Sequence, residues 1–307
     1  MIALAWLGRE EEWKARLAEG IEQFPDNSNV YWAPGWIALR NGQLDETVRW
    51  FRETAKHDPE NPLWPTIVAI YLIRLGADRE AEPWVDLADF LGPGSYQALR
   101  ARFRMDRFRQ KPEAMRESAL RLLGGAFRLT YQEYLELYEW LRWLQLSEPD
   151  LALAYYERFY PQLLRQIPGV NAFNYAAAIG LAHLQLQRGA RDEPVRLLET
   201  ALAVVETMPW RSVSADARAM IYTLQGDHER ALEELRSIID RVATLGWRHL
   251  EWEPVYEPLR NHPEFRELIA ELKADKTLTL QLERLREMEK AGELAVHPAA
   301  EAARAPG

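Results

Sequence analysis

The sequence contains no cysteine among its 307 residues, which excludes disulfide bonds, thiolate catalysis and cysteine-bound metal centres. No apolar run approaches the roughly 18 residues that a helix needs to cross a bilayer. Glycine-rich phosphate loops are missing as well, because Gly92-Pro93-Gly94 has the pattern of a turn and Gly124-Gly125 lacks the lysine and hydroxyl residue that such a loop requires. These absences exclude enzymes that use a catalytic thiolate, a cysteine-bound metal or a glycine-rich nucleotide-binding loop.

Other patterns of catalysis and metal binding are also missing. No histidine lies three or four residues from another, so the chain has no helical zinc motif, and no serine occupies a nucleophile elbow. The densest group of possible ligands, His249, Glu251 and Glu253, lies beside Trp247 and Trp252, and we interpret it as part of an aromatic loop. We therefore expect no catalytic residues, no metal and no cofactor. An enzyme would require a site assembled from distant residues.

The composition indicates a folded and acidic protein. Hydrophobic residues make up 48% of the chain, and the net charge of -9 disfavours general nucleic-acid binding. The opening run MIALAWLG is followed by Arg9 and three glutamates, with no basic leader and no cleavage site, so it does not have the pattern of a signal peptide. A cytoplasmic location is the expectation if the chain is complete. The alignment with later repeats instead places Met1 in the middle of a first helix.

A period of 34 residues organises the first third of the chain. Four sets of residues share this step: Gly8, Gly42 and Gly76; Pro25, Pro59 and Pro93; Leu17, Phe51 and Val85; Gly20, Thr54 and Ala88. Glycine ends a first helix in a left-handed conformation, proline closes a second helix, and the small residues let two helices approach closely. The period therefore predicts successive helical hairpins.

The pattern resembles the tetratricopeptide (TPR) repeat, most closely over Ser28 to Asn61 and Pro62 to Phe90. Thr47 departs from it, since it stands where the family prefers alanine. Pro34 lies where the first helix of its repeat should already be running, so we expect that helix to start late, with Pro34 in its first turn.

Beyond residue 93 the period drifts, although hairpins continue. Later turns are predicted near Arg109, Ser147, Gly189 and Gly226. The predicted fold is an all-α, right-handed solenoid of about seven TPR-like hairpins with a C-terminal capping helix. We expect repeats over 1–246, the first truncated at its N-terminus, then a loop and capping helices over 247–294, and a disordered tail over 295–307.

A second resemblance concerns the segment VYEPLRNHPEFRELIAELKADKTLTLQLERLREMEKAGEL. It is similar to the C-terminal end of TPR modules in bacterial signalling proteins, such as nucleotide cyclases and membrane-bound winged-helix transcription regulators. The resemblance implies a regulatory or sensory module of a larger bacterial signalling protein, with an unknown protein or peptide as its partner.

The first helices of TPR-like stacks line a concave face, which gives a candidate groove for that partner. The mapped inward positions are Trp32, Trp36, Leu39, Arg40, Thr66, Ile70, Ile73 and Arg74. Family members that hold a chaperone peptide's carboxylate use lysine and asparagine at two of these sites, where this chain has Trp32 and Trp36. The groove is thus predicted to be apolar and to take a hydrophobic segment. The alternative is that a tight superhelix, or the chain's own C-terminal helix, already fills it.

A second candidate surface is basic. Arg100, Arg104, Arg107 and Lys111 recur at helical spacing and form one stripe, which would suit nucleic acid or another anionic partner. Charge runs of this kind are more often solvated faces that pair with acids on adjoining helices. The leading hypothesis is therefore a non-enzymatic protein-interaction module, and the alternative is a helical-repeat subunit that binds an anionic partner.

Overall fold

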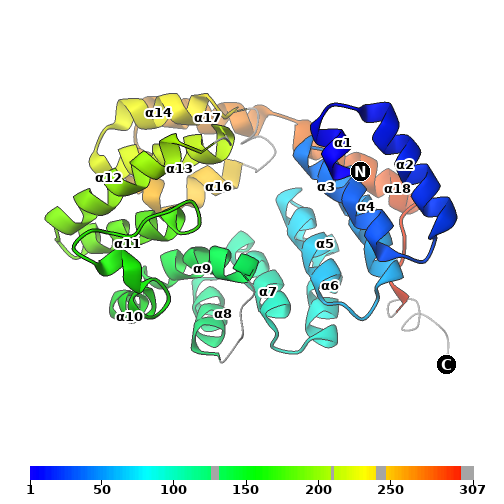
Figure 1. The fold of residues 1–307 in the computed structure, drawn as a ribbon, viewed down its shortest axis with the longest axis horizontal. Coiled ribbons are helices and arrows are strands. Elements are labelled where there is room, and N and C mark those ends of the chain that lie inside the picture. Colours follow the sequence, from blue (N-terminus) through cyan, green and yellow to red (C-terminus); the bar gives the residue numbers. More distant parts are fainter. Residues whose placement is uncertain (126–130, 209–210, 240–246, 299–307) are drawn as a thin grey trace. The chain divides into compact units, whose positions relative to one another are not determined.

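The computed structural model describes residues 1–125, 131–208, 211–239 and 247–298, and every regular element in these ranges is a helix (Figure 1). The predicted all-α class is confirmed for this part of the chain. None of its helices is long and apolar enough to cross a membrane. The contacts divide the chain into two compact units, and each is described by itself.

Unit 1 comprises Met1–Pro112 and the C-terminal part from Lys276 onward. Its helices are α1 (Ile2–Trp6), α2 (Glu10–Gln23), α3 (Ser28–Arg40), α4 (Leu44–His57), α5 (Leu63–Arg74), α6 (Asp78–Leu91), α7 (Tyr96–Phe108) and α18 (Thr277–Lys290). Consecutive helices pack as the pairs α1–α2, α3–α4 and α5–α6, and α5 also contacts α4 and α7.

Unit 2 comprises Glu113–Asp275. Its elements are α8 (Pro112–Gly124), which begins at the boundary, α9 (Tyr131–Leu144), α10 (Pro149–Phe159), η1 (Pro161–Leu164), α11 (Tyr175–Gln187), α12 (Asp192–Glu206), α13 (Arg211–Gln225), α14 (His228–Arg236), α16 (Trp247–Trp252), η2 (Pro254–Leu259) and α17 (Pro263–Ala274). The pairs here are α9–α10, α11–α12 and α13–α14, and η2 packs against α13.

The glycine turns predicted from the 34-residue period are present. Gly8, Gly42 and Gly76 have φ angles of 71°, 73° and 81°, the left-handed region in which glycine meets no steric penalty. Gly189 and Gly226 adopt the same conformation in unit 2. The repeating apolar and small positions are also buried, including Phe51, Val85 and Ala88, except that Gly20 is partly exposed. The hairpin pattern is therefore set by local backbone chemistry.

The prediction that Pro34 starts a helix is wrong. Helix α3 begins at Ser28, where the Asn27 side chain accepts a hydrogen bond from the Asn29 amide, and Pro34 lies inside it. Asparagine at this position satisfies an amide that has no partner within the helix. The cap therefore starts the helix early, and Ala33, Pro34 and Gly35 lie buried within it.

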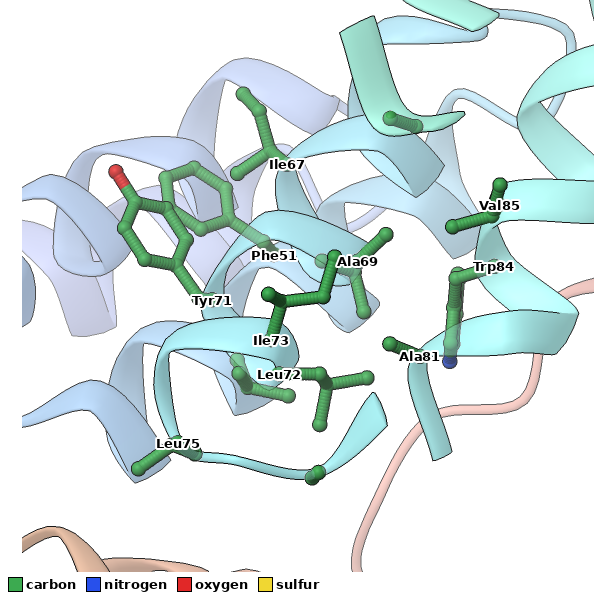
Figure 2. Packing of buried hydrophobic residues seen from close by; sticks show 14 of the residues in the cluster. Phe51, Ile67, Ala69, Tyr71, Leu72, Ile73, Leu75, Ala81, Trp84 and Val85 are labelled. Atoms are coloured by element: carbon green, nitrogen blue, oxygen red, sulfur yellow. The ribbon is translucent and has the colours of Figure 1, made fainter. Parts of the chain in front are cut away.

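Helix α5 is the centre of the unit 1 core (Figure 2). Every residue from Pro65 to Ile73 is buried, because α4, α6 and α7 surround the helix. Phe51 of α4 lies in a layer of aromatic rings, with centroids 6.1 Å from those of both Trp64 and Tyr71. Such a layer favours close packing between hairpins, because offset rings pack well.

The C-terminal helix α18 belongs to this same core. It contacts α4, and Leu285 is buried while Leu278, Leu282 and Met288 pack against the cluster around α5. The contacts therefore group α18 with the first hairpins, whereas the predicted boundaries separated residues 247–294 from the repeats as a C-terminal unit.

The tail prediction is wrong for its first residues. Ala295 and His297 are 8% and 2% exposed, respectively. Arg52 Nε donates to the Ala295 carbonyl at 2.9 Å, and His297 Nε2 lies 3.1 Å from the Pro59 carbonyl. These bonds to α4 and the turn after it order the segment, which the small and polar composition did not reveal. The remaining tail residues, 299–307, lie outside the described chain.

One buried side chain fixes the position of α18 along α4. Gln281 Oε1 accepts from the backbone amides of Leu44 and Asp45, and its Nε2 donates to the Gly42 carbonyl at 2.9 Å. The N-terminal amides of a helix have no partner within the helix, and the N-cap residue Gln43 makes no side-chain bond to them. Gln281 thus caps α4 from a distant helix.

Gln281→Ala should lower the free energy of unfolding by about 1–3 kcal/mol, because it leaves buried backbone groups without a partner. Urea unfolding followed by circular dichroism measures this change. Thr279→Ala is the matched control, since Thr279 is exposed on the same helix. Equal stability of the two variants would contradict the capping role.

Candidate functional site

Unit 1 contains a pocket of about 540 Å³ between α6, α18 and the residues that follow α18. Its apolar lining is Leu72, Pro83, Trp84, Leu87, Phe90, Leu282, Leu285 and Val296. Phe90 lies at the pocket and is 73% exposed. The pocket therefore offers an apolar wall that is open to a ligand or partner.

The charged side chains around this pocket are paired with one another or with neighbours. Arg286 bonds Glu80, and Asp86 accepts from Arg102 at 2.8 Å. Arg52 lies over the Trp84 ring, 5.4 Å from its centroid, and bonds Glu289 at 3.3 Å. Charges committed in this way attract a further charged group weakly, so the pocket suits an apolar group.

His297 closes one side of the pocket, with its ring edge-on to Trp84 at a centroid distance of 6.4 Å. A carbonyl carries no proton, so Nε2 is the donor to Pro59 and Nδ1 is unprotonated in the neutral ring. Burial lowers the pKa of His297 below its usual value of 6.5, and the bond to Pro59 opposes this shift only in part. The docked segment therefore favours a neutral imidazole.

Acidification should weaken this docking. Well above a pH of 6.5 the His297 ring is neutral in both the folded and the unfolded chain, so its full contribution to the free energy of unfolding is present. Between 6.5 and the lower folded pKa the unfolded chain binds more protons, and stability falls as the pH falls. We expect the wild type to lose more stability than His297→Asn between pH 7.5 and 5.5, measured by urea unfolding. His183 contributes equally to both proteins, so identical losses would contradict the assignment.

Most of the predicted groove residues on α5 do not lie on an open surface. Thr66, Ile70 and Ile73 are buried, so the prediction that they line an open groove is wrong. Helix α7 covers this side of α5, and Thr66 Oγ1 donates to the Gln97 carbonyl at 3.0 Å. Arg74 lies over the Tyr71 ring, 5.1 Å from its centroid.

The other groove residues lie on α3. Trp32, Trp36 and Leu39 are partly buried against the unit 1 core, and Arg40 is exposed. Trp36 packs edge-on against Phe51 at a centroid distance of 5.4 Å. The two tryptophans therefore serve the core as well as any surface that they present.

The basic stripe lies on α7 and the turn after it. Arg100, Arg104 and Arg107 are partly buried and Lys111 is exposed. Other basic residues of this region pair with α6: Arg102 bonds Asp86, and Arg109 bonds both Asp78 and Glu82. The geometry of these pairs matches the solvated, ion-paired face that charge runs usually form.

Unit 2 contains a buried polar cluster that sequence reasoning missed. Arg142 of α9 and Glu253, just before η2, form an ion pair of 3.1 Å in which the side chains are 6% and 1% exposed. Gln145 Nε2 lies 3.1 Å from His183 Nδ1, and the His183 side chain is buried. We name Arg142, Gln145, Tyr156, His183 and Glu253 the inner polar cluster.

The electrostatics of this cluster follow from its burial. Burial is the largest single influence on Arg142 and lowers its pKa, but Glu253 together with Tyr138, Glu139 and Tyr156 outweighs it, and the net pKa lies above the usual value. Burial raises the pKa of Tyr156 and lowers that of His183, so both stay neutral at pH 7. Removing one partner of such an ion pair costs about 3–5 kcal/mol, because the other charge is then left buried without a partner.

Gly180 of α11 allows this cluster to assemble. A Cβ atom there would collide with the Tyr156 hydroxyl and would lie 3.0 Å from Arg142 Cγ. Gly124, at the end of α8, is different, because a Cβ would meet only the Tyr155 hydroxyl at an ordinary 3.5 Å. A glycine in mid-helix has an entropic cost, and here close approach explains it.

Gly180→Ala should destabilise unit 2 by about 1–3 kcal/mol, the usual effect of overpacking, and Gly124→Ala should not. Adding Tyr156→Phe removes the colliding hydroxyl, so the double variant should lose less than the sum of the single losses. A double-mutant cycle from thermal or urea unfolding measures this coupling. Additive losses would show that the hydroxyl is not the cause.

Part of this site lies in the least regular region of the repeat pattern. Arg142 and Tyr156 fall in the hairpins where the period had drifted, so their inward positions could not be assigned. Glu253 was grouped with His249 and Glu251 as a possible ligand set. In the structure Glu251 instead bonds Lys273 at 2.8 Å, and the side chain of His249 lies outside the described residues.

Comparison with models of known protein families and with curated proteins gives no match for this chain. The function proposed below therefore depends on the geometry of the molecule and on the sequence pattern.

Proposed function

We propose that the protein is a non-enzymatic interaction module, a right-handed solenoid of TPR-like hairpins that binds a partner protein. The repeat pattern supports this architecture, because stacked hairpins present extended surfaces suited to recognition. The likeness of its C-terminal part to modules of bacterial signalling proteins supports a regulatory role within a larger protein of that kind.

The observation that carries the proposal is the unit 1 pocket. It is preformed and lined mainly by apolar side chains, and its charged neighbours are already paired. The partner chemistry that fits is a peptide segment that inserts a large apolar side chain beside Phe90. Buried aromatic contacts of this type often dominate the binding energy of an interface. The proposed binding surface therefore lies on α6 and α18, and not in the groove that the sequence predicted on α3 and α5.

A displayed peptide library selected on the immobilised full chain tests the proposal. Phe90→Ala should weaken the selected peptides at least tenfold, or about 1.4 kcal/mol, because it removes the exposed wall of the pocket. Fluorescence anisotropy with labelled peptides gives the dissociation constants.

Phe24→Ala is the matched control, because Phe24 is also a large exposed aromatic residue of unit 1, 56% exposed, and does not line this pocket. Its peptide affinity should equal that of the wild type. Equal weakening by both substitutions, or by neither, would refute the pocket as the binding site.

A further inference from the structure

We infer that the surface beneath α18 is a site that recognises a helix. In this structure α18 occupies the site, and an amphipathic helix of a partner protein, with similar apolar and polar residues, can replace it. This inference rests on the proposed function and names the partner class. The α18-binding surface is defined as the turn from Gly42 to Asp45, the face of α4 beneath α18, and Glu80 of α6.

The contact has the form of a helix lying in an apolar groove. Residues 278, 281, 282, 285 and 288 recur at helical spacing, and their side chains face the core. Glu283, Glu287 and Lys290 are exposed on the remainder of the helix. Recognition of one apolar face at i, i+3, i+4 and i+7 is a recurring mode of protein–peptide binding.

Polar contacts make this surface specific in sequence. Gln281 satisfies both an amide pair and a carbonyl of the turn, so a shift of α18 by one residue would leave these groups without partners. Arg284 bonds Asp45 at 2.7 Å, and Arg286 bonds Glu80. The surface therefore recognises a glutamine that is followed by arginines three and five residues later.

The occupant does not fill its site. The pocket of about 540 Å³ remains beside Leu282 and Leu285, and the buried Asp45 Oδ1 atom lacks a hydrogen bond. Unfilled apolar volume beside a docked helix means that dispersion contacts are missing there. A partner helix with a larger apolar residue at the position of Leu282 would gain those contacts, so it can compete with the attached helix.

A fluorescein-labelled peptide of residues 277–298 provides the first test on the full chain. It should bind Gln281→Ala and the double variant Arg284→Ala/Arg286→Ala at least tenfold more tightly than the wild type, because these changes weaken the attached α18. Both arginines are about half exposed, at 53% and 52%, so the double variant should remain folded. A peptide with Leu282→Trp should bind more tightly still.

The peptide carrying Gln281→Ala and Leu285→Ala is the matched control, and it should not bind. Equal affinity of the unmodified peptide for the wild type and both variants, or no binding to any of them, would overturn the inference. If a Phe90-dependent peptide from the library still binds in that case, the proposed function stands and only the recognition of a helix fails.

Native-state hydrogen exchange of the wild type is a second measurement that needs no substitution. The amides of α18 should exchange through an opening that leaves α5 protected. Exchange of α18 and α5 with the same free energy would show that α18 cannot leave without global unfolding, and this result would also overturn the inference.

Discussion

Helices α4 and α5 carry apolar residues toward more than one neighbouring helix, and burying all of this surface is the constraint on which unit 1 depends. Helix α5 meets it fully, since α4, α6 and α7 surround it. Helix α4 has α3 and α5 as neighbours, and the rest of its apolar surface is covered by α18. Burying one leucine such as Leu285 contributes about 1.5–3 kcal/mol, so a helix from the far end of the chain is retained by a few side chains.

The parts of the fold that could be predicted from the sequence are those that depend on the backbone conformation of a single residue. A glycine such as Gly42 or Gly76 ends a helix through its own backbone angles, so the turn period could be read directly. The order at Ala295 could not be read, because its partner Arg52 lies 243 residues away in the sequence. Composition describes only what a segment can bury, and it does not say which surface the segment will meet.

The predicted groove shows a related limit. The inward positions of a repeat are accessible to a partner only if neighbouring first helices do not pack against each other. The distance between those helices cannot be predicted from the repeat pattern. Here α7 packs on α5, so Thr66 and Ile73 become core residues. The pocket lies outside the predicted groove, beside α6, where α18 does not fully cover the hairpins. Most of its residues come from α6, α18 and the segment after α18, with Arg52 of α4 and Leu72 of α5 beside them, and no local pattern connects these segments.

The buried Gln281 side chain and the buried Arg142–Glu253 pair act in different ways. Gln281 is neutral, and the backbone of the turn satisfies both ends of its amide, so its burial selects one axial position of α18 at little cost. Arg142 and Glu253 are charged, and several polar atoms around them lack hydrogen bonds, so that pair stabilises less than its geometry implies. The α18-binding surface makes specific polar contacts with α18 but incomplete apolar contacts, so it recognises this helix without burying it fully. That combination distinguishes the α18-binding surface from the core around α5.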